Sequence, residues 1–196
     1  MGRNVEPMAD AADDLARWAA ALEPRWREPV QRAIASRDRY RGIVAGLAEG
    51  PTKQRLTSLA PTMDLSVQKI ADAVWRASNA RSIADGFDVE AATSELKSAR
   101  RDLAAIASAG GDTTALQARV DALAQRHRAI NDALNLAEDS GGAFEEMNLR
   151  LETAVAHAAS VALRAGQLPE GSGPVPELEA FVGELSALDA ALAELG

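Results

Sequence analysis

The sequence predicts an all-α protein, more narrowly an elongated, antiparallel up-and-down helical bundle with coiled-coil-like packing. Apolar residues make up 47% of the 196-residue chain but aromatic residues only 4%, which suits thin cores between close-packed helices. Apolar residues recur at alternating steps of three and four in each long segment, the spacing of one narrow helical face. Short glycine links between these segments favour antiparallel neighbours.

The stretch from residue 88 to residue 137 carries this pattern most regularly. Two helices are expected to face each other across Gly110-Gly111, with Asp88 as the N-cap of the first. Their apolar faces comprise Val89, Ala92, Leu96, Ala99, Leu103 and Ile106, and Leu116, Val120, Leu123, His127, Ile130, Leu134 and Ala137. We expect Leu103 and Leu123 to be buried where these faces meet.

Proline and glycine divide the first half of the chain. The helices expected there span residues 6–22, 29–48 and 62–84, with a short helix around residues 56–59. Pro24 should end the first helix, and a link carrying Trp26 should follow it. Gly50-Pro51 and Pro61 should both interrupt the helical pattern.

The whole chain is expected to divide into three parts: a bundle, a linker and a C-terminal helix. Ser140-Gly141-Gly142 should form a turn before another regular helix, which completes a bundle of residues 1–166. Residues 167–176 have the composition of a flexible Gly/Pro linker. Residues 177–196 then form an acidic amphipathic helix, and removing this tethered helix is expected to leave the bundle folded with a modest loss of stability.

Composition excludes several classes of function. The net charge of −8 argues against nucleic acid as the main partner, because neutralising phosphates dominates that affinity. The chain lacks cysteine, a membrane-spanning apolar run and the apolar core of a signal peptide, so a cytoplasmic protein is expected. No nucleophile, phosphate-binding or dinucleotide motif is present, which predicts a non-enzymatic protein without cofactor or metal.

The two histidines, His127 and His157, are the candidates for a metal site. If a turn centred near Gly141 pairs the flanking helices, His127 lies within about one helical turn of His157. A helical metal site would also need a carboxylate at helical spacing, and neither histidine has one. A structural His127 is therefore the preferred interpretation, and a metalloprotein or enzyme around the pair is the less favoured one.

The favoured function is an interaction or scaffold protein that acts through helical surfaces and the tethered C-terminal helix. The candidate partner-binding residues are Leu178, Phe181, Leu185, Leu188, Leu192, Trp26, Arg25 and Arg27. The leucine-rich face should dock on its own bundle, and a partner protein or a second copy of the chain should be able to replace that contact.

Segment 18–41, rich in Trp and Arg, could instead bind an anionic membrane surface. Arg81, within an apolar face, is expected to extend its charged end toward water or to pair with a facing carboxylate such as Glu90 or Glu95.

Overall fold

A computed structural model describes residues 12–165 and 176–194, and these residues form six α-helices and no strand. The helices are α1 (Ala12–Ala21), α2 (Pro24–Ala45), α3 (Pro51–Asp85), α4 (Val89–Ser108), α5 (Thr114–Ala165) and α6 (Pro176–Glu194). The all-α helical bundle predicted from the sequence is confirmed. The expected linker, residues 167–176, and the expected start of the first helix near residue 6 lie outside the described residues, apart from Pro176.

The chain divides into two compact units. The first combines the residues up to Arg76 with those from Gly141 onward, and the second comprises Ala77–Ser140. The first unit therefore contains α1, α2, most of α3, the C-terminal half of α5 and α6. The second contains the end of α3, the whole of α4 and the N-terminal half of α5.

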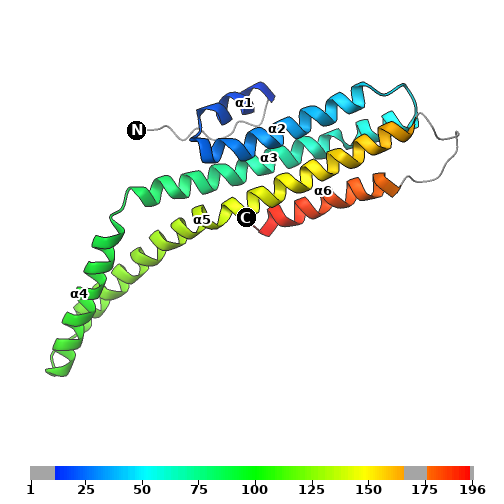
Figure 1. Cartoon of the computed structure of the whole chain (residues 1–196). Helices are drawn as coiled ribbons and strands as arrows, with labels where there is room; N and C mark the ends of the chain where they lie inside the picture. Colours follow the sequence, from blue (N-terminus) through cyan, green and yellow to red (C-terminus); the bar gives the residue numbers. More distant parts are fainter. Residues whose placement is uncertain (1–11, 166–175, 195–196) are drawn as a thin grey trace. The chain divides into compact units, whose positions relative to one another are not determined.

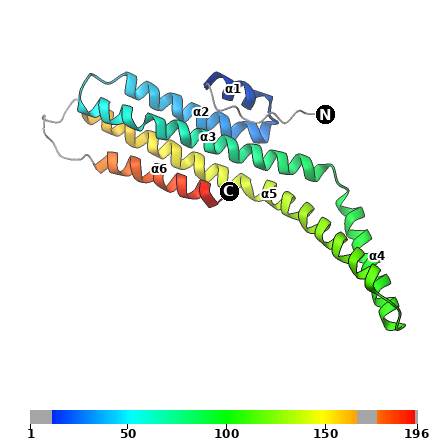
Figure 2. The same ribbon diagram turned by 180° about the vertical axis from the view of Figure 1, so that it is seen from behind.

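Within the first unit, α2, α3, α6 and the second half of α5 lie side by side as a four-helix bundle, with α1 against α2 (Figures 1 and 2). Ion pairs on the surface show which helices are neighbours. They are Arg41–Asp64 between α2 and α3, Lys69–Asp189 between α3 and α6, Arg150–Glu184 between α6 and α5, and Arg32–Glu152 between α5 and α2.

Helices that follow one another in this bundle run antiparallel, as the sequence pattern predicts, but two neighbouring pairs run parallel. Asn148 of α5 donates to the Pro29 carbonyl oxygen of α2 at 3.1 Å, and one turn further along both helices Arg32 binds Glu152 at 2.9 Å. Contacts that advance together along both helices require the same direction. The bundle thus consists of two antiparallel hairpins, α2–α3 and α5–α6, set beside each other.

The centre of this bundle is built from large side chains of all four helices. Tyr40 of α2 stacks on Phe181 of α6 with 5.3 Å between ring centroids and 6° between planes, and neither residue is exposed. Other fully buried side chains are Leu56, Met63, Ile70, Phe144, Met147, Leu151 and Leu188. Burying an aliphatic or aromatic side chain of this size contributes about 1.5–3 kcal/mol, so these residues hold the four helices together.

The second unit has a much thinner core. Leu96 and Ala99 of α4 and Val120 of α5 are buried together, with Leu103 and Leu123 only partly buried against them. The face-to-face pairing of α4 and α5 follows the predicted apolar faces. The burial expected for Leu103 and Leu123 is incomplete, because a two-helix hairpin leaves the flanks of its apolar faces open to water.

Local backbone chemistry at both ends of α4 agrees with the sequence prediction. Asp88 caps the helix by accepting a hydrogen bond from the Ala91 backbone N–H at 2.8 Å. At the other end the Gly111 N–H donates to the Ile106 carbonyl oxygen at 3.0 Å, and Gly110 has a φ of +70°. This is a Schellman ending, in which glycine occupies the left-handed position without a steric penalty.

Gly110→Ala should lower the free energy of unfolding by about 1 kcal/mol, because a Cβ at positive φ approaches the following carbonyl oxygen. No neighbouring atom lies within 4 Å of the added Cβ, so backbone strain alone sets this loss. Urea unfolding would measure it. Gly141→Ala is a suitable control, since that glycine lies inside α5 with open space and no positive φ; equal losses in the two variants would contradict the prediction.

Two predicted breaks in the helical pattern are wrong. Residues 51–85 form one helix that passes through Pro61, and α2 begins at Pro24 and passes through Pro29. A proline inside a helix costs about 3 kcal/mol. Leu56 and Met63 on either side of Pro61 are fully buried, and together their burial offsets that cost.

The predicted turn at Ser140-Gly141-Gly142 is also wrong, because α5 continues through these residues. Each glycine costs a helix only about 1 kcal/mol relative to alanine, which is less than one buried side chain returns. Ala137 and Ser140 before the glycines and Phe144 after them are buried at 5%, 3% and 2% exposure. Tertiary burial therefore outweighs the local preference for a turn.

None of the described helices combines the length and the apolar character that crossing a membrane requires.

Candidate functional site

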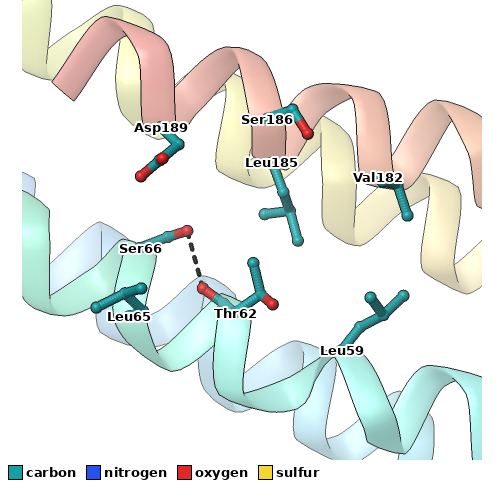
Figure 3. A pocket seen from close by; sticks show the side chains of 8 residues that line it. All are labelled: Leu59, Thr62, Leu65, Ser66, Val182, Leu185, Ser186 and Asp189. Carbon is teal, nitrogen blue, oxygen red and sulfur yellow. Dashed lines mark hydrogen bonds between the residues drawn. The ribbon is translucent and has the colours of Figure 1, made fainter. Parts of the chain in front are cut away.

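Described residues of α3 and α6 form a groove on the first unit. It has a volume of about 300 Å³. Its lining consists of Leu59, Thr62, Leu65 and Ser66 from α3 and Val182, Leu185, Ser186 and Asp189 from α6 (Figure 3). Small side chains at three of these positions leave the space that larger ones would fill.

The apolar side chains of the groove differ in their accessibility. Leu185 is buried at 3% exposure, whereas Leu65 of α3 and Val182 of α6 are 53% and 43% exposed. Figure 3 shows Leu65 and Val182 on opposite helices, with Leu185 projecting between the two helices. An apolar group entering the groove would therefore contact all three side chains and remove them from water.

The polar lining forms a rim. Ser66 donates its hydroxyl proton to the Thr62 carbonyl oxygen at 3.0 Å, which leaves the Ser66 oxygen able to accept. Asp189 binds the Lys69 ammonium group. No basic residue occurs between 176 and 194, while carboxylates occur at 177, 179, 184, 189 and 194. Of these carboxylates only Asp189 lines the groove, which is thus apolar at its base with one ion-paired carboxylate on its α6 side.

The predicted partner-binding leucines do not face this groove as a group. Leu178, Phe181, Leu185, Leu188 and Leu192 form the core face of α6, and their exposures range from 0% to 7%. The structure places this core face on the chain's own bundle, with only Leu185 also reaching the groove. Partner contacts on α6 must therefore use the residues beside the core face unless α6 first detaches.

Tyr40 of α2 contacts both α3 and α6 in the core of the first unit. Its hydroxyl donates to the Leu56 carbonyl oxygen of α3 at 2.5 Å, and its ring stacks on Phe181. Burial raises the pKa of Tyr40 to about 12, because a phenolate would lose its hydration there.

The stability of the protein should therefore fall at high pH through Tyr40. The pKa of Tyr40 is raised from its ordinary value of 10.0, so the folded state holds the proton more tightly than the unfolded state does. The contribution of the neutral Tyr40 to the free energy of unfolding is therefore fully present below pH 10, and roughly 2–3 kcal/mol is lost as the pH rises through about 12. Tyr40→Phe should remove that part of the pH dependence and cost about 1 kcal/mol at pH 7. Since the chain has one tyrosine, tyrosinate absorbance reads the titration directly. A Tyr40 pKa of about 10 in the folded protein, the ordinary value for tyrosine, would refute this prediction.

The Trp/Arg segment is held within the first unit by contacts of its own. Trp26 is 6% exposed and meets Phe144 edge-on at 6.5 Å, with the Arg25 guanidinium 4.2 Å from its ring centroid. Arg27 donates to the Leu22 carbonyl oxygen at 2.8 Å. A membrane-binding role would require Trp26 to leave the core.

The buried Arg37 and the half-buried Arg81 also have partners. Arg37, at 6% exposure, binds Asp38 at 2.8 Å. Arg81 binds Asp85 at 2.8 Å and lies 3.7 Å from Glu138, so it pairs with carboxylates as expected, although these are not the suggested Glu90 or Glu95. Glu138 lies on the part of α5 that belongs to the same unit as Arg81.

The two histidines do not form a joint site. Because residues 140–142 are helical, the turn that would pair His127 with His157 is not there. Thr93 already donates its hydroxyl proton to the Val89 carbonyl oxygen, so His127 Nε2 donates to Thr93 Oγ1 at 3.1 Å. Nδ1 then accepts from Asn131 at 3.2 Å. No group of three or more potential metal ligands occurs among the described residues.

His127→Leu should change the free energy of unfolding by less than about 1 kcal/mol, because lost hydrogen bonds are offset by an apolar side chain between α4 and α5. Thermal unfolding by circular dichroism would measure this, with Thr93→Val as a control that removes the same hydrogen bond from the other side. A loss above about 2 kcal/mol would mean that His127 does more than link the two helices.

Leu185 is the one groove residue that was predicted as a partner-binding residue, whereas Leu65 and Val182 were missed because they lie outside the apolar faces. Leu65 falls between the face positions Met63 and Val67 of α3, and Val182 follows the core residue Phe181 directly. Large apolar residues out of phase with their helix were the available signal.

Comparison with protein-family models, with curated proteins and with solved structures finds no match.

Proposed function

We propose that this chain is a non-enzymatic interaction protein that binds an amphipathic segment of another protein in the α3–α6 groove. The observation that carries the proposal is the presence of two exposed apolar side chains, Leu65 of α3 and Val182 of α6, at the two ends of one groove whose base is apolar (Figure 3). Exposed apolar surface organised around a concavity, with a polar rim, is typical of sites that take an apolar anchor.

The size of the groove indicates what kind of ligand it takes. About 300 Å³ lies at the lower limit of small-molecule sites and accommodates one or two large side chains. The α6 side contributes carboxylates and no cation. We therefore expect a segment with one bulky apolar anchor and at least one Lys or Arg, which competes with Lys69 for the exposed Asp189 carboxylate.

Selection of random peptides on the immobilised full-length protein tests this directly. Enriched peptides should combine a large apolar residue with basic residues. Calorimetric titration of such a peptide should show at least about tenfold weaker binding to Leu65→Asp and Val182→Asp, because each change places a carboxylate where the anchor sits. Asp189→Asn should weaken binding by a smaller factor, and more so at low salt.

A matched control is Leu136→Asp, which alters a 41%-exposed leucine of the second unit. This variant should bind the peptide as the parent chain does. The proposal fails if no peptide is enriched, or if the enriched peptides bind Leu65→Asp and the parent chain equally.

A further inference from the structure

A second exposed apolar surface lies on α5 within the first unit. Leu163 and Leu149 are 77% and 59% exposed, the two highest values for large apolar side chains among the described residues. They lie about four helical turns apart on one helix and therefore point in the same direction. Neither contributes to the α3–α6 groove.

The residues between these leucines complete a regular face. Thr153, Ala156 and Ser160 occupy the steps of four and three from Leu149 to Leu163, the a and d positions of a heptad repeat. None of the five side chains is charged, and all are exposed or half-buried. This α5 outer face has the spacing of a coiled-coil contact, and its small central side chains permit close approach of another helix.

Charges beside the α5 outer face favour one orientation of such a helix. One flank carries Arg150, His157 and Arg164, and the other carries Glu145 and Glu152. In a parallel, in-register pair of identical helices, the acidic flank of each copy faces the basic flank of the other. Glu145 of one copy then meets Arg150 of the other, and Glu152 meets His157. An antiparallel pair would instead bring the basic flank against itself.

We propose that a second copy of this chain docks on the α5 outer face, with the two α5 helices parallel, in register and related by a twofold axis along them. The face is self-complementary: the residues on the axis meet their own equivalents, and Glu145 of each copy meets Arg150 of the other, which is the reciprocity of a twofold interface. Arg150 and Glu152 already form surface ion pairs with Glu184 and Arg32, so the flanking charges set the orientation and contribute little affinity. The contact is small, which makes the dimer weak and reversible.

Sedimentation of the full-length chain over a wide concentration range tests the dimer. The parent chain should show a reversible monomer–dimer equilibrium, and Leu149→Glu or Leu163→Glu should raise its dissociation constant at least about tenfold. Leu136→Glu, on the second unit, should leave the constant unchanged. A parent chain that stays monomeric at the highest concentrations overturns the proposal, as does a dimer that both Leu149→Glu and Leu163→Glu leave intact.

Cysteine cross-linking tests the orientation, because the natural chain has no cysteine. Ser160→Cys should form an intermolecular disulfide on mild oxidation, since equivalent positions of a parallel pair lie within disulfide range. Ser98→Cys, exposed on α4, should cross-link far more slowly. Rapid cross-linking of Ala156→Cys without that of Ser160→Cys would show an antiparallel pair and overturn the proposed arrangement.

Discussion

A chain that ends at residue 166 should lose cooperative folding of the first unit. Removing α6 uncovers Tyr40 and the side chains that meet its core face, and each of the five core-face residues contributes about 1.5–3 kcal/mol through burial. Together this approaches the whole stability of a typical domain, about 5–15 kcal/mol. Thermal and urea unfolding, followed by tryptophan fluorescence, would show a broad transition in place of a cooperative one.

This expectation is stronger than the modest loss predicted from the sequence, and the reason is the near-complete burial of Phe181 and Leu188. A control separates loss of α6 from loss of chain connectivity. A protease site inserted between residues 170 and 171 should give a nicked protein that keeps α6 and melts cooperatively. Cooperative melting of the truncated chain, within about 1 kcal/mol of the full chain, would show that the remaining helices form a sufficient core.

Phe181→Ala should lower the free energy of unfolding by about 3–5 kcal/mol, the range found for removing a buried phenylalanine ring. The loss combines transfer of the ring to water with a cavity beside Tyr40, whose own ring would lose its stacking partner. Urea unfolding measures the change. Val182→Ala, at the adjacent and 43%-exposed position, should cost less than about 1 kcal/mol. Equal effects at the two positions would mean that α6 is rotated about its axis.

Helix ends and apolar faces that depend on nearby residues could be predicted from the sequence. The capping carboxylate of Asp88 and the left-handed glycine at Gly110 act within a few residues of the helix end that they define. The apolar faces of α4 and α5 were likewise visible, because period alone places Leu96, Ala99 and Val120 on facing sides. Such features need no knowledge of the rest of the fold.

Sequence reasoning failed where distant burial outweighs a local preference. Pro61 and Gly141-Gly142 carry strong local signals for a break, yet both lie within continuous helices. The penalties of a few kcal/mol are known from the sequence, but the burial of Leu56, Met63 and Phe144 that offsets them is not. That burial depends on which helices become neighbours.

The α3–α6 groove could not be predicted for a related reason. Its two walls come from segments about 120 residues apart, as the Lys69–Asp189 contact shows. The groove also requires α3 and α6 to run parallel, whereas the sequence pattern indicates only that consecutive helices are antiparallel. Leu65 and Val182 could have been noted as apolar residues out of phase, but nothing local indicates that they line one groove.

The stacking of Tyr40 on Phe181 gives the protein a built-in optical reporter for α6. No other tyrosine is present in the sequence, so the rate at which Tyr40 ionises after a rapid jump to high pH measures how often hydroxide reaches the core. A peptide that fills the groove while α6 stays in place should leave this rate unchanged or slower. A peptide that displaces α6 should accelerate it, so one absorbance trace distinguishes the two modes of binding.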